Sequence, residues 1–301
     1  MKNIHQKYEI EQFVNKYLNS EFERIQKYSY IDLKIKPTEQ QCIKEWDTLV
    51  NSDKNWTYSN IVKRFHSSIL LANKAGDMSP YNRWELIKSD IQQFRKLFEN
   101  RLKYNKTFIT NGLPKDGIIP LHIYAQGINV MRWSPEVSYF KPSTARNIIK
   151  DHLNEYDIIF DPFSGYSGRM LGTLACDKKY CGNDISNLVI NESNEIYKWL
   201  SSMYKLPDVY MSCADVHTYT GTFPCLFTCP PYGDIEQWPG VEKTNTTCDE
   251  WIDVCLNNFT CDTYVFVTDD KISKWKTHIV GTIENKSHFG TNIEYIVKIY
   301  R

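Results

Sequence analysis

One glycine-rich turn constrains the fold of this chain more than any other segment: Asp161-Pro162-Phe163-Ser164-Gly165-Tyr166-Ser167-Gly168. It follows the apolar run 157–160 and precedes a stretch with helical spacing that starts near Arg169. The glycines allow positive φ and a close backbone approach to a ligand. The free N–H groups of the helix start point at whatever is bound. The pattern therefore predicts a strand, a ligand-binding turn and a helix.

A second turn lies further along the chain: Thr228-Cys229-Pro230-Pro231-Tyr232-Gly233. It follows the short apolar strand Leu226-Phe227. Its two prolines fix a rigid turn that has few hydrogen-bond donors and ends in an aromatic ring. We expect the first turn to hold a cofactor and the second to present a flat face to a planar substrate.

Together the two turns resemble those of the DNA amino-methyltransferases that depend on S-adenosylmethionine (SAM). This family methylates the exocyclic nitrogen of adenine (N6) or of cytosine (N4). In it, a turn of form Asp-Pro-Phe-x-Gly-x-Gly binds the methyl donor, and a turn of form (Asp/Asn/Ser)-Pro-Pro-(Tyr/Phe/Trp) binds the target base. The resemblance covers roughly residues 135–301 and implies SAM as the cofactor and DNA as the partner.

Strands and helices alternate in the second part of the chain. Strands are expected at 157–160, 179–183, 208–213, 225–229 and 263–268, and helices from about 169, at 186–202 and at 249–259. This alternation predicts a mostly parallel, doubly wound sheet, closed by an antiparallel hairpin of 278–283 and 292–300. It matches the Rossmann-like class I methyltransferase fold that the resemblance implies, in which ligands bind at the carboxyl ends of the strands.

The first part of the chain has the pattern of helices. Thr38-x-x-Gln41 is typical of a capping box, and Ser79-Pro80 is a typical helix start. Two glycines and two prolines between residues 105 and 120 indicate a linker. We therefore expect a helical domain over 1–120 and a catalytic α/β domain over 121–301.

The predicted cofactor site contains two acids that follow strands. Asp184 lies nineteen positions after Gly165, a spacing typical of an acid that binds ribose hydroxyls. Asp215 follows the third strand and is expected to accept a hydrogen bond from the adenine amino group. The other predicted cofactor residues are Lys141 and Ser143 beside the methionyl group, Asp161 at its end, Phe163 over it, and the turn glycines Gly165 and Gly168.

The second turn carries the predicted catalytic residues, Cys229, Pro230, Pro231 and Tyr232. An exocyclic amine is a poor nucleophile because its lone pair is delocalised into the ring. An enzyme helps by accepting hydrogen bonds from the amine and by aligning it with the methyl group. The resemblance implies that the Pro230 carbonyl accepts such a bond and that Tyr232 stacks on a base flipped out of the duplex.

Cys229 departs from the family pattern because thiol sulfur is a weak hydrogen-bond acceptor. Either the Pro230 carbonyl carries most of the polarisation, or Thr228 or Asp234 assists. A small residue after threonine favours the cytosine-N4 pattern over the adenine-N6 pattern, and both stay open.

Three other functions remain open. Methylation of cytosine C5 through a covalent cysteine adduct has a sequence match in Pro224-Cys225, but that pair precedes its strand and would lie at the far end of the sheet. RNA guanine-N2 methyltransferases share the Pro-Pro-Tyr turn. An inactive methyltransferase-like subunit that binds nucleic acid is the third alternative.

Charge is unevenly distributed along a chain whose net charge is zero. Residues 1–120 contain 20 Lys and Arg against 14 Asp and Glu, a net of +6. A basic region favours contact with a polyanion, although solvated helix faces explain it equally well. DNA contacts are expected at Lys63, Arg64, Arg95 and Lys96. The same domain could instead bind a partner subunit or form a dimer.

Composition excludes several classes of protein. No stretch approaches the roughly 18 consecutive apolar residues of a membrane span, and the N-terminus lacks the apolar core of a signal peptide. The nine cysteines include no Cys-x-x-Cys pair, so neither a disulfide framework nor a metal site is indicated. We expect an intracellular, cytoplasmic protein from a bacterial, phage or viral setting.

Overall fold

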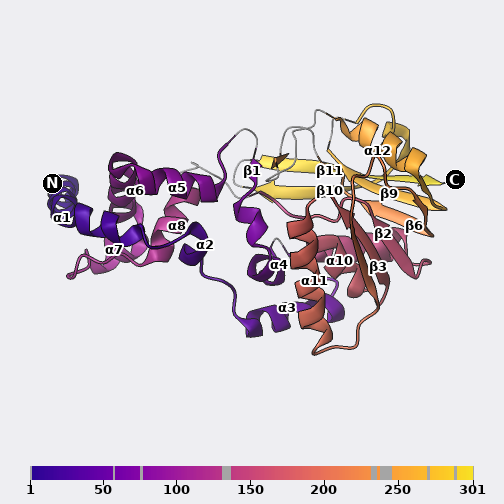
Figure 1. The fold of residues 1–301 in the computed structure, drawn as a ribbon, viewed down its shortest axis with the longest axis horizontal. Coiled ribbons are helices and arrows are strands. Elements are labelled where there is room, and N and C mark those ends of the chain that lie inside the picture. The colour runs from indigo at the N-terminus through magenta and orange to yellow at the C-terminus, as the bar shows by residue number, and fades with distance from the viewer. Residues whose placement is uncertain are drawn as a thin grey trace. The chain divides into compact units, whose positions relative to one another are not determined.

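The computed structural model describes residues 2–56, 58–74, 77–130, 137–231, 236–237, 246–269, 272–287 and 290–300. The chain forms two compact units (Figure 1). The helical unit comprises residues 1–36 and 69–137, and the sheet unit comprises residues 37–68 and 138–301.

The helical unit is built around aromatic side chains. Phe94, Leu97 and Phe98 fall at helix spacing on α6 and are fully buried, and Trp84 and Tyr124 pack into the same core. Its elements are α1 (Lys2–Ile25), α2 (Tyr30–Leu33), β1 (Asn73–Lys74), α5 (Pro80–Ser89), α6 (Ile91–Tyr104), α7 (Lys106–Asn111) and α8 (Leu121–Val130).

The boundary between the units differs from the one expected at residue 120. The stretch expected to be a linker contains α7, whose Phe108 is buried in the helical core. The next helix, α8, places Ile123 and Ile128 in that core as well. Burial of these apolar side chains keeps the chain in the helical unit until residue 137.

The sheet unit contains a seven-stranded sheet in the order β10-β11-β9-β6-β2-β3-β4. In this order the neighbours β9, β6, β2, β3 and β4 run parallel to one another. The strand β11 runs antiparallel to β9 and to β10. This confirms the class I methyltransferase fold. The strands are β2 (Ile158–Asp161), β3 (Lys179–Asp184), β4 (Val209–Cys213), β6 (Cys225–Thr228), β9 (Thr263–Thr268), β10 (Ile279–Ser287) and β11 (Gly290–Tyr300).

Helices cover both faces of this sheet (Figure 1). Ile159, Phe227 and Val265 face α9, whereas the next residue on β2, Phe160, faces α12. The alternation follows from the two-residue period of a strand. The helices and shorter elements of this unit are α3 (Glu39–Asn51), α4 (Asn60–Phe65), α9 (Pro142–His152), α10 (Gly168–Leu174), α11 (Asn187–Ser201), β5 (Gly221–Thr222), β7 (Glu236–Gln237), α12 (Cys248–Asn258), β8 (Phe259–Thr260) and η2 (Lys276–His278), and η1 (Ser67–Leu70) follows α4.

Segment 37–68 belongs to the sheet unit although it lies among the helices of the first 120 residues. The predicted capping box starts α3, since Thr38 and Gln41 exchange bonds between side chain and backbone. Arg146 of α9 donates to the carbonyl of Leu49 in the last turn of α3 and to that of Lys54 beyond it. A buried guanidinium thus satisfies carbonyls at the C-terminal end of a helix, where a positive charge is favourable.

A buried carboxylate anchors the other end of the segment. Glu192 of α11 accepts hydrogen bonds from the Ser67 and Ser68 amides at 2.9 and 3.1 Å, and His66 Nδ1 lies 3.0 Å from it. Burial acts to raise the pKa of Glu192, but the bonds from His66 and the two serines outweigh it and lower the pKa. The helix α4 ends at Phe65, His66 is its C-cap, and the amides that follow bond to this carboxylate.

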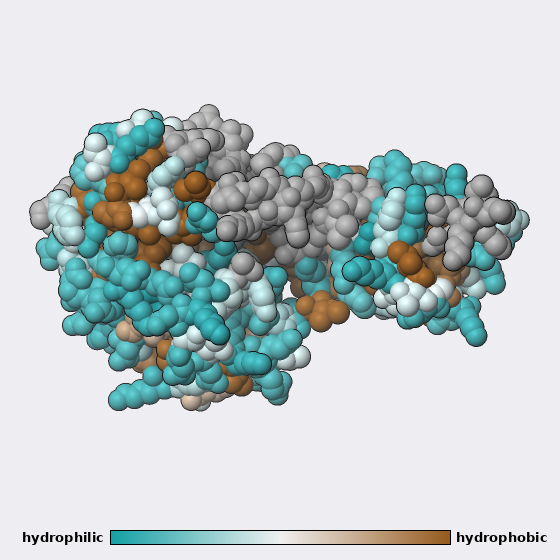
Figure 2. All heavy atoms as spheres, turned by 180° about the vertical axis from the view of Figure 1, so that it is seen from behind, coloured by the Kyte–Doolittle hydropathy of each residue, from teal (hydrophilic) through white to brown (hydrophobic). Residues whose placement is uncertain are grey.

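Hydrophobic side chains reach the surface of both units among hydrophilic ones (Figure 2). The most exposed include Ile35 and Ile109 in the helical unit and Tyr210 and Ile185 in the sheet unit. In the part of the chain that the structure describes, no helix has the length and apolar character needed to cross a bilayer.

Replacing Glu192 with Gln should lower the free energy of unfolding by about 2 kcal/mol at neutral pH, because a charged acceptor with several donors is lost. The pKa of Glu192 is lower in the folded protein than in the unfolded chain, so as the pH falls the unfolded carboxyl is protonated first. Its stabilisation is therefore complete above about pH 4.3 and is lost as the pH falls through the folded pKa. Urea unfolding at a series of pH values should show a shallower acid loss in Glu192→Gln.

Glu195→Gln is the matched control, because Glu195 is exposed on the same helix. Equal acid dependence in the wild type and in Glu192→Gln would contradict the anchoring role of Glu192.

Candidate functional site

The two predicted turns leave the same edge of the sheet. Asp161, Asp184 and Thr228 are the last residues of β2, β3 and β6, and these three strands are parallel neighbours. Their carboxyl ends therefore meet where the glycine turn and the Pro-Pro turn begin. This is the position at which open α/β sheets bind ligands.

Asp184 supports the glycine turn directly. The Gly165 amide donates to one carboxylate oxygen at 2.9 Å, and the Ser186 amide donates to the other at 2.9 Å. Gly165 has φ of 53°, in the left-handed region that favours glycine. Burial raises the pKa of Asp184, against the opposing effect of the two amides. The side chain is half-buried and keeps about two of its roughly four acceptor sites.

Gly168 has a packing role that the sequence did not predict. A Cβ atom at this position would overlap the backbone carbonyl of Phe140, and one at Gly172 would meet Ala145 and the Arg146 amide. Both glycines therefore let α10 lie directly against α9 and the residues before it. Gly168 itself is buried, and its contact with the cofactor stays a prediction.

Ser167, which precedes α10, belongs to a buried polar chain that the sequence analysis missed. It has φ of 61°, and its hydroxyl is hydrogen-bonded to His66 Nε2 and to Ser193 Oγ, each at 2.7 Å. Because His66 also contacts Glu192, the chain links segment 37–68 to the glycine turn. Nothing local in the sequence pairs residues this far apart.

Asp161 ends β2, and other side chains of the protein surround its carboxylate. Its side chain is fully buried, so it presents no exposed oxygen to a methionyl group. Arg169 Nε and the Tyr180 hydroxyl each donate to Oδ2 at 2.7 Å, and the Thr228 hydroxyl donates to Oδ1 at 2.6 Å. Burial acts to lower the pKa of Arg169, but the charge of Asp161 outweighs it and raises the pKa.

Asn183 connects the loops around the predicted cofactor edge. Its side-chain amide donates to the carbonyls of Pro162 and Ala214, and its oxygen accepts from Ser212. The neighbouring Asp215 is exposed and accepts from the His217 amide at 2.9 Å. Asp215 thus has open acceptor capacity at the place where the sequence predicted it.

Phe163 lies beside an aromatic pair. Its ring makes an edge contact with Trp251 of α12 at 5.1 Å between centroids, and Trp251 packs against His217 at 5.1 Å. Phe163 and Gly165 are half-buried, whereas the other residues from 161 to 168 are buried. The open surface of the glycine turn therefore consists of an aromatic ring and a glycine.

Two predicted cofactor residues, Lys141 and Ser143, lie at the start of α9. Lys141 precedes the helix and is half-buried. Ser143, which was predicted to line the cofactor site, is fully buried. Its hydroxyl accepts from the Trp56 amide at 3.2 Å instead. A serine in the first turn of α9 is satisfied by segment 37–68 rather than by the helix that it begins.

The catalytic turn is described up to Pro231. Cys229 and Pro231 are half-buried and Pro230 is buried. Tyr232 and Asp234 lie outside the described residues. Thr228, which ends β6, is held by Asp161, and this gives the turn a fixed starting point.

Cys225 lies where covalent C5 chemistry cannot use it. It is fully buried at the first position of β6, and its thiol donates to the carbonyl of Ile158, the first residue of β2. It therefore lies at the amino end of the sheet, opposite the two turns. Burial also raises the pKa of its thiol well above the ordinary range.

The predicted phosphate contacts fall in different units. Lys63 is exposed on α4 of the sheet unit, whereas the neighbouring Arg64 donates to the Pro37 carbonyl at 2.7 Å. Arg95 on α6 of the helical unit pairs with Glu99 at 2.8 Å, and Lys96 beside it is exposed. Lys63 and Lys96 thus keep their charge exposed, while both arginines make intramolecular contacts.

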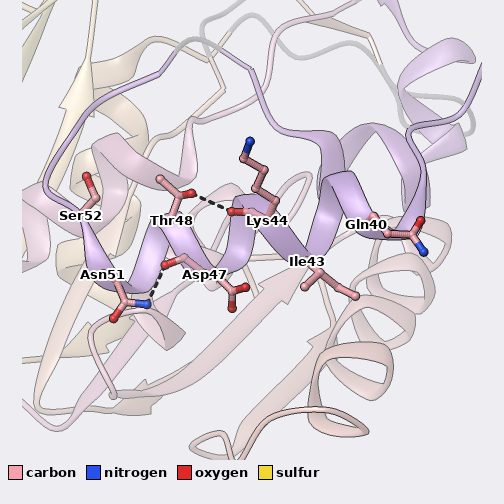
Figure 3. A pocket seen from close by; sticks show the side chains of 7 residues that line it. All are labelled: Gln40, Ile43, Lys44, Asp47, Thr48, Asn51 and Ser52. Atoms are coloured by element: carbon pink, nitrogen blue, oxygen red, sulfur yellow. Dashed lines mark hydrogen bonds between the residues drawn. The ribbon is translucent and has the colours of Figure 1, made fainter.

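An open hollow of about 470 Å³ lies along α3 (Figure 3). All seven of its lining side chains come from α3 and the residue after it. Its Asp47 accepts from Tyr204, beyond the C-terminal end of α11, whereas the predicted cofactor edge lies near the start of that helix. The hollow is thus separate from the two turns, and a single helix face does not surround a ligand.

No protein-family model and no curated protein matches this sequence. Some solved methyltransferase structures are similar to this chain at low identity. The magnesium protoporphyrin IX methyltransferase of Synechocystis PCC 6803 with bound SAM is 10% identical, covering 68% of this chain and 96% of its own, with a TM-score of 0.39. A SAM-dependent methyltransferase from Agrobacterium tumefaciens is 13% identical, covering 55% of this chain and 64% of its own, with a TM-score of 0.39. The fold assignment rests on the strand order of the chain itself.

Gly168→Ala should lower the free energy of unfolding by about 3 kcal/mol, because a new methyl group would overlap a backbone carbonyl that no side-chain rotation can move. Gly165→Ala is the comparison and should cost about 1 kcal/mol, the penalty of a left-handed backbone. Urea unfolding measures both. A Gly168→Ala protein as stable as Gly165→Ala would contradict the packing role of Gly168.

Proposed function

We propose that this protein transfers a methyl group from SAM to the exocyclic amino group of a base in DNA, at N4 of cytosine or N6 of adenine. One observation carries the proposal. The glycine turn and the Pro-Pro turn leave neighbouring parallel strands at one edge of the sheet, and Thr228 Oγ1 donates across to Asp161 Oδ1 at 2.6 Å. Methyl transfer needs a donor site and an acceptor site in contact, and these turns provide the two sites.

The residues around the glycine turn suit the parts of SAM. The open acceptor sites of Asp184 fit the ribose hydroxyls, and the exposed carboxylate of Asp215 fits the adenine amino group. The half-buried ring of Phe163 offers an apolar surface for the methionyl end. When bound, SAM supplies an electrophilic methyl group on its sulfonium.

The catalytic turn supplies the acceptor side of the reaction. The Pro230 carbonyl accepts a hydrogen bond from the target amine, which increases the electron density on nitrogen and orients it for attack. Tyr232 stacks on the flipped base, an interaction worth about 1–3 kcal/mol. The Cys229 thiol is not a nucleophile in direct transfer, because the amine nitrogen itself attacks the methyl group.

DNA is the proposed partner because the target base belongs to it, and its phosphate backbone attracts basic side chains. Lys63 and Lys96 are the contacts that this proposal favours, since both are exposed. Arg64 and Arg95 would have to leave a backbone carbonyl and a glutamate to contribute. Contacts between lysines and phosphates weaken as the salt concentration rises, because binding releases counterions.

Asp184→Ala should weaken SAM binding at least tenfold, because hydrogen bonds to a charged acceptor contribute about 1.5–3 kcal/mol, and Gly165→Val should do the same by blocking the turn. Isothermal titration calorimetry with SAM measures both. Asp208→Ala is the matched control, since Asp208 lies before β4 at the opposite edge of the sheet and pairs with Lys179. Unchanged affinity in folded Asp184→Ala and Gly165→Val would remove the cofactor assignment.

Cys229→Ser should keep methyl-transfer activity, because serine supplies the acceptor typical of the family, whereas Tyr232→Ala should lose most of it. The assay incubates each variant with SAM and with DNA or RNA, and identifies the methylated nucleoside by mass spectrometry. Detection of 5-methylcytosine, or an inactive Cys229→Ser that still binds SAM and DNA, would overturn amino methylation. SAM binding without methylation of either polymer would favour an inactive subunit.

A further inference from the structure

The carboxylate of Asp161 is hydrogen-bonded to three other side chains of the protein. Its oxygens accept from the Arg169 guanidinium, from the Tyr180 hydroxyl and from Thr228, and the carboxylate is fully buried. Arg169 also donates to the Phe163 carbonyl within the glycine turn. The carboxylate therefore joins the glycine turn, the strand β3 and the end of β6.

The bond to Thr228 has a particular consequence for the chain that follows. Cys229 precedes a proline and Pro230 precedes another, so both are restricted to extended backbone, and the two prolines have fixed φ. Few soft dihedral angles remain between Thr228 and the end of the Pro-Pro turn. The position of the Thr228 hydroxyl is thus transmitted to the Pro230 carbonyl.

We propose that Asp161 and Thr228 are positioning residues that hold the Pro230 carbonyl in register with the glycine turn, so that this hydrogen bond governs the rate of methyl transfer and not the affinity for the methyl donor. The proposal rests on the proposed function. It gives Asp161 a role different from the methionine contact expected of its motif.

The test compares Thr228→Val, which keeps the shape but lacks the hydroxyl, with Thr228→Ser, which keeps the hydroxyl. Thr228→Val should lower kcat about tenfold or more, as expected for loss of one buried hydrogen bond to a charged group, while the Kd for SAM changes less than about threefold. Thr228→Ser should restore most of kcat. Thr263→Val is the matched control. It removes a buried hydroxyl bond, to Tyr156 at 2.7 Å, at the start of β9, which lies at the end of the sheet away from the two turns.

A second readout does not need catalysis. Cys229 is half-buried directly after Thr228, so its alkylation by iodoacetamide, followed by peptide mass spectrometry, reports the position of the turn. Thr228→Val should change this rate several-fold, and Thr228→Ser and Thr263→Val should not. If the wild type methylates no nucleic acid, the proposed function fails and the alkylation rate alone decides the positioning role.

Two results would overturn the proposal. One is a folded Thr228→Val with the wild-type kcat and the wild-type alkylation rate. The other is a loss of SAM affinity in Thr228→Val that accounts for the whole loss of rate, because the hydroxyl would then serve the donor site and not the catalytic turn.

Discussion

The organisation of the site depends on one buried negative charge. A carboxylate removed from water is costly unless donors surround it, and Asp161 meets this condition through Arg169, Tyr180 and Thr228. These donors come from α10, β3 and the end of β6. The requirement to satisfy one charge therefore brings three separate elements together at the carboxyl edge of the sheet.

A second buried carboxylate has the same effect on a larger scale. Glu192 on α11 collects the amides of Ser67 and Ser68 and contacts His66, and His66 reaches Ser167 beside the glycine turn. Residues 37–68 are consequently part of the sheet unit, although in the sequence they lie between the two segments of the helical unit, 1–36 and 69–137. Removing the N-terminal region as a block would take away partners of Glu192 and expose a buried charge.

Much of the fold could be predicted because its signals are local. The strand expected at 263–268 is β9 with the same bounds, and the helix expected at 186–202 is α11 within one residue at each end. Uninterrupted apolar runs and helix caps depend on neighbours in sequence, so they survive folding. The glycine turn and the acid nineteen positions later were predictable for the same reason, since their spacing belongs to one strand-turn-helix-strand unit.

The sequence by itself determined the α/β class, the mostly parallel sheet with its closing hairpin, and the meeting of two turns at one sheet edge. Only the tertiary structure decided that Asp161 binds protein groups, that Gly168 makes room for the Phe140 carbonyl, and that Ser143 bonds to Trp56. The physical reason is that a residue type sets how many hydrogen bonds a side chain needs and how much space it fills. Which distant residues meet those needs is settled only when the elements pack together.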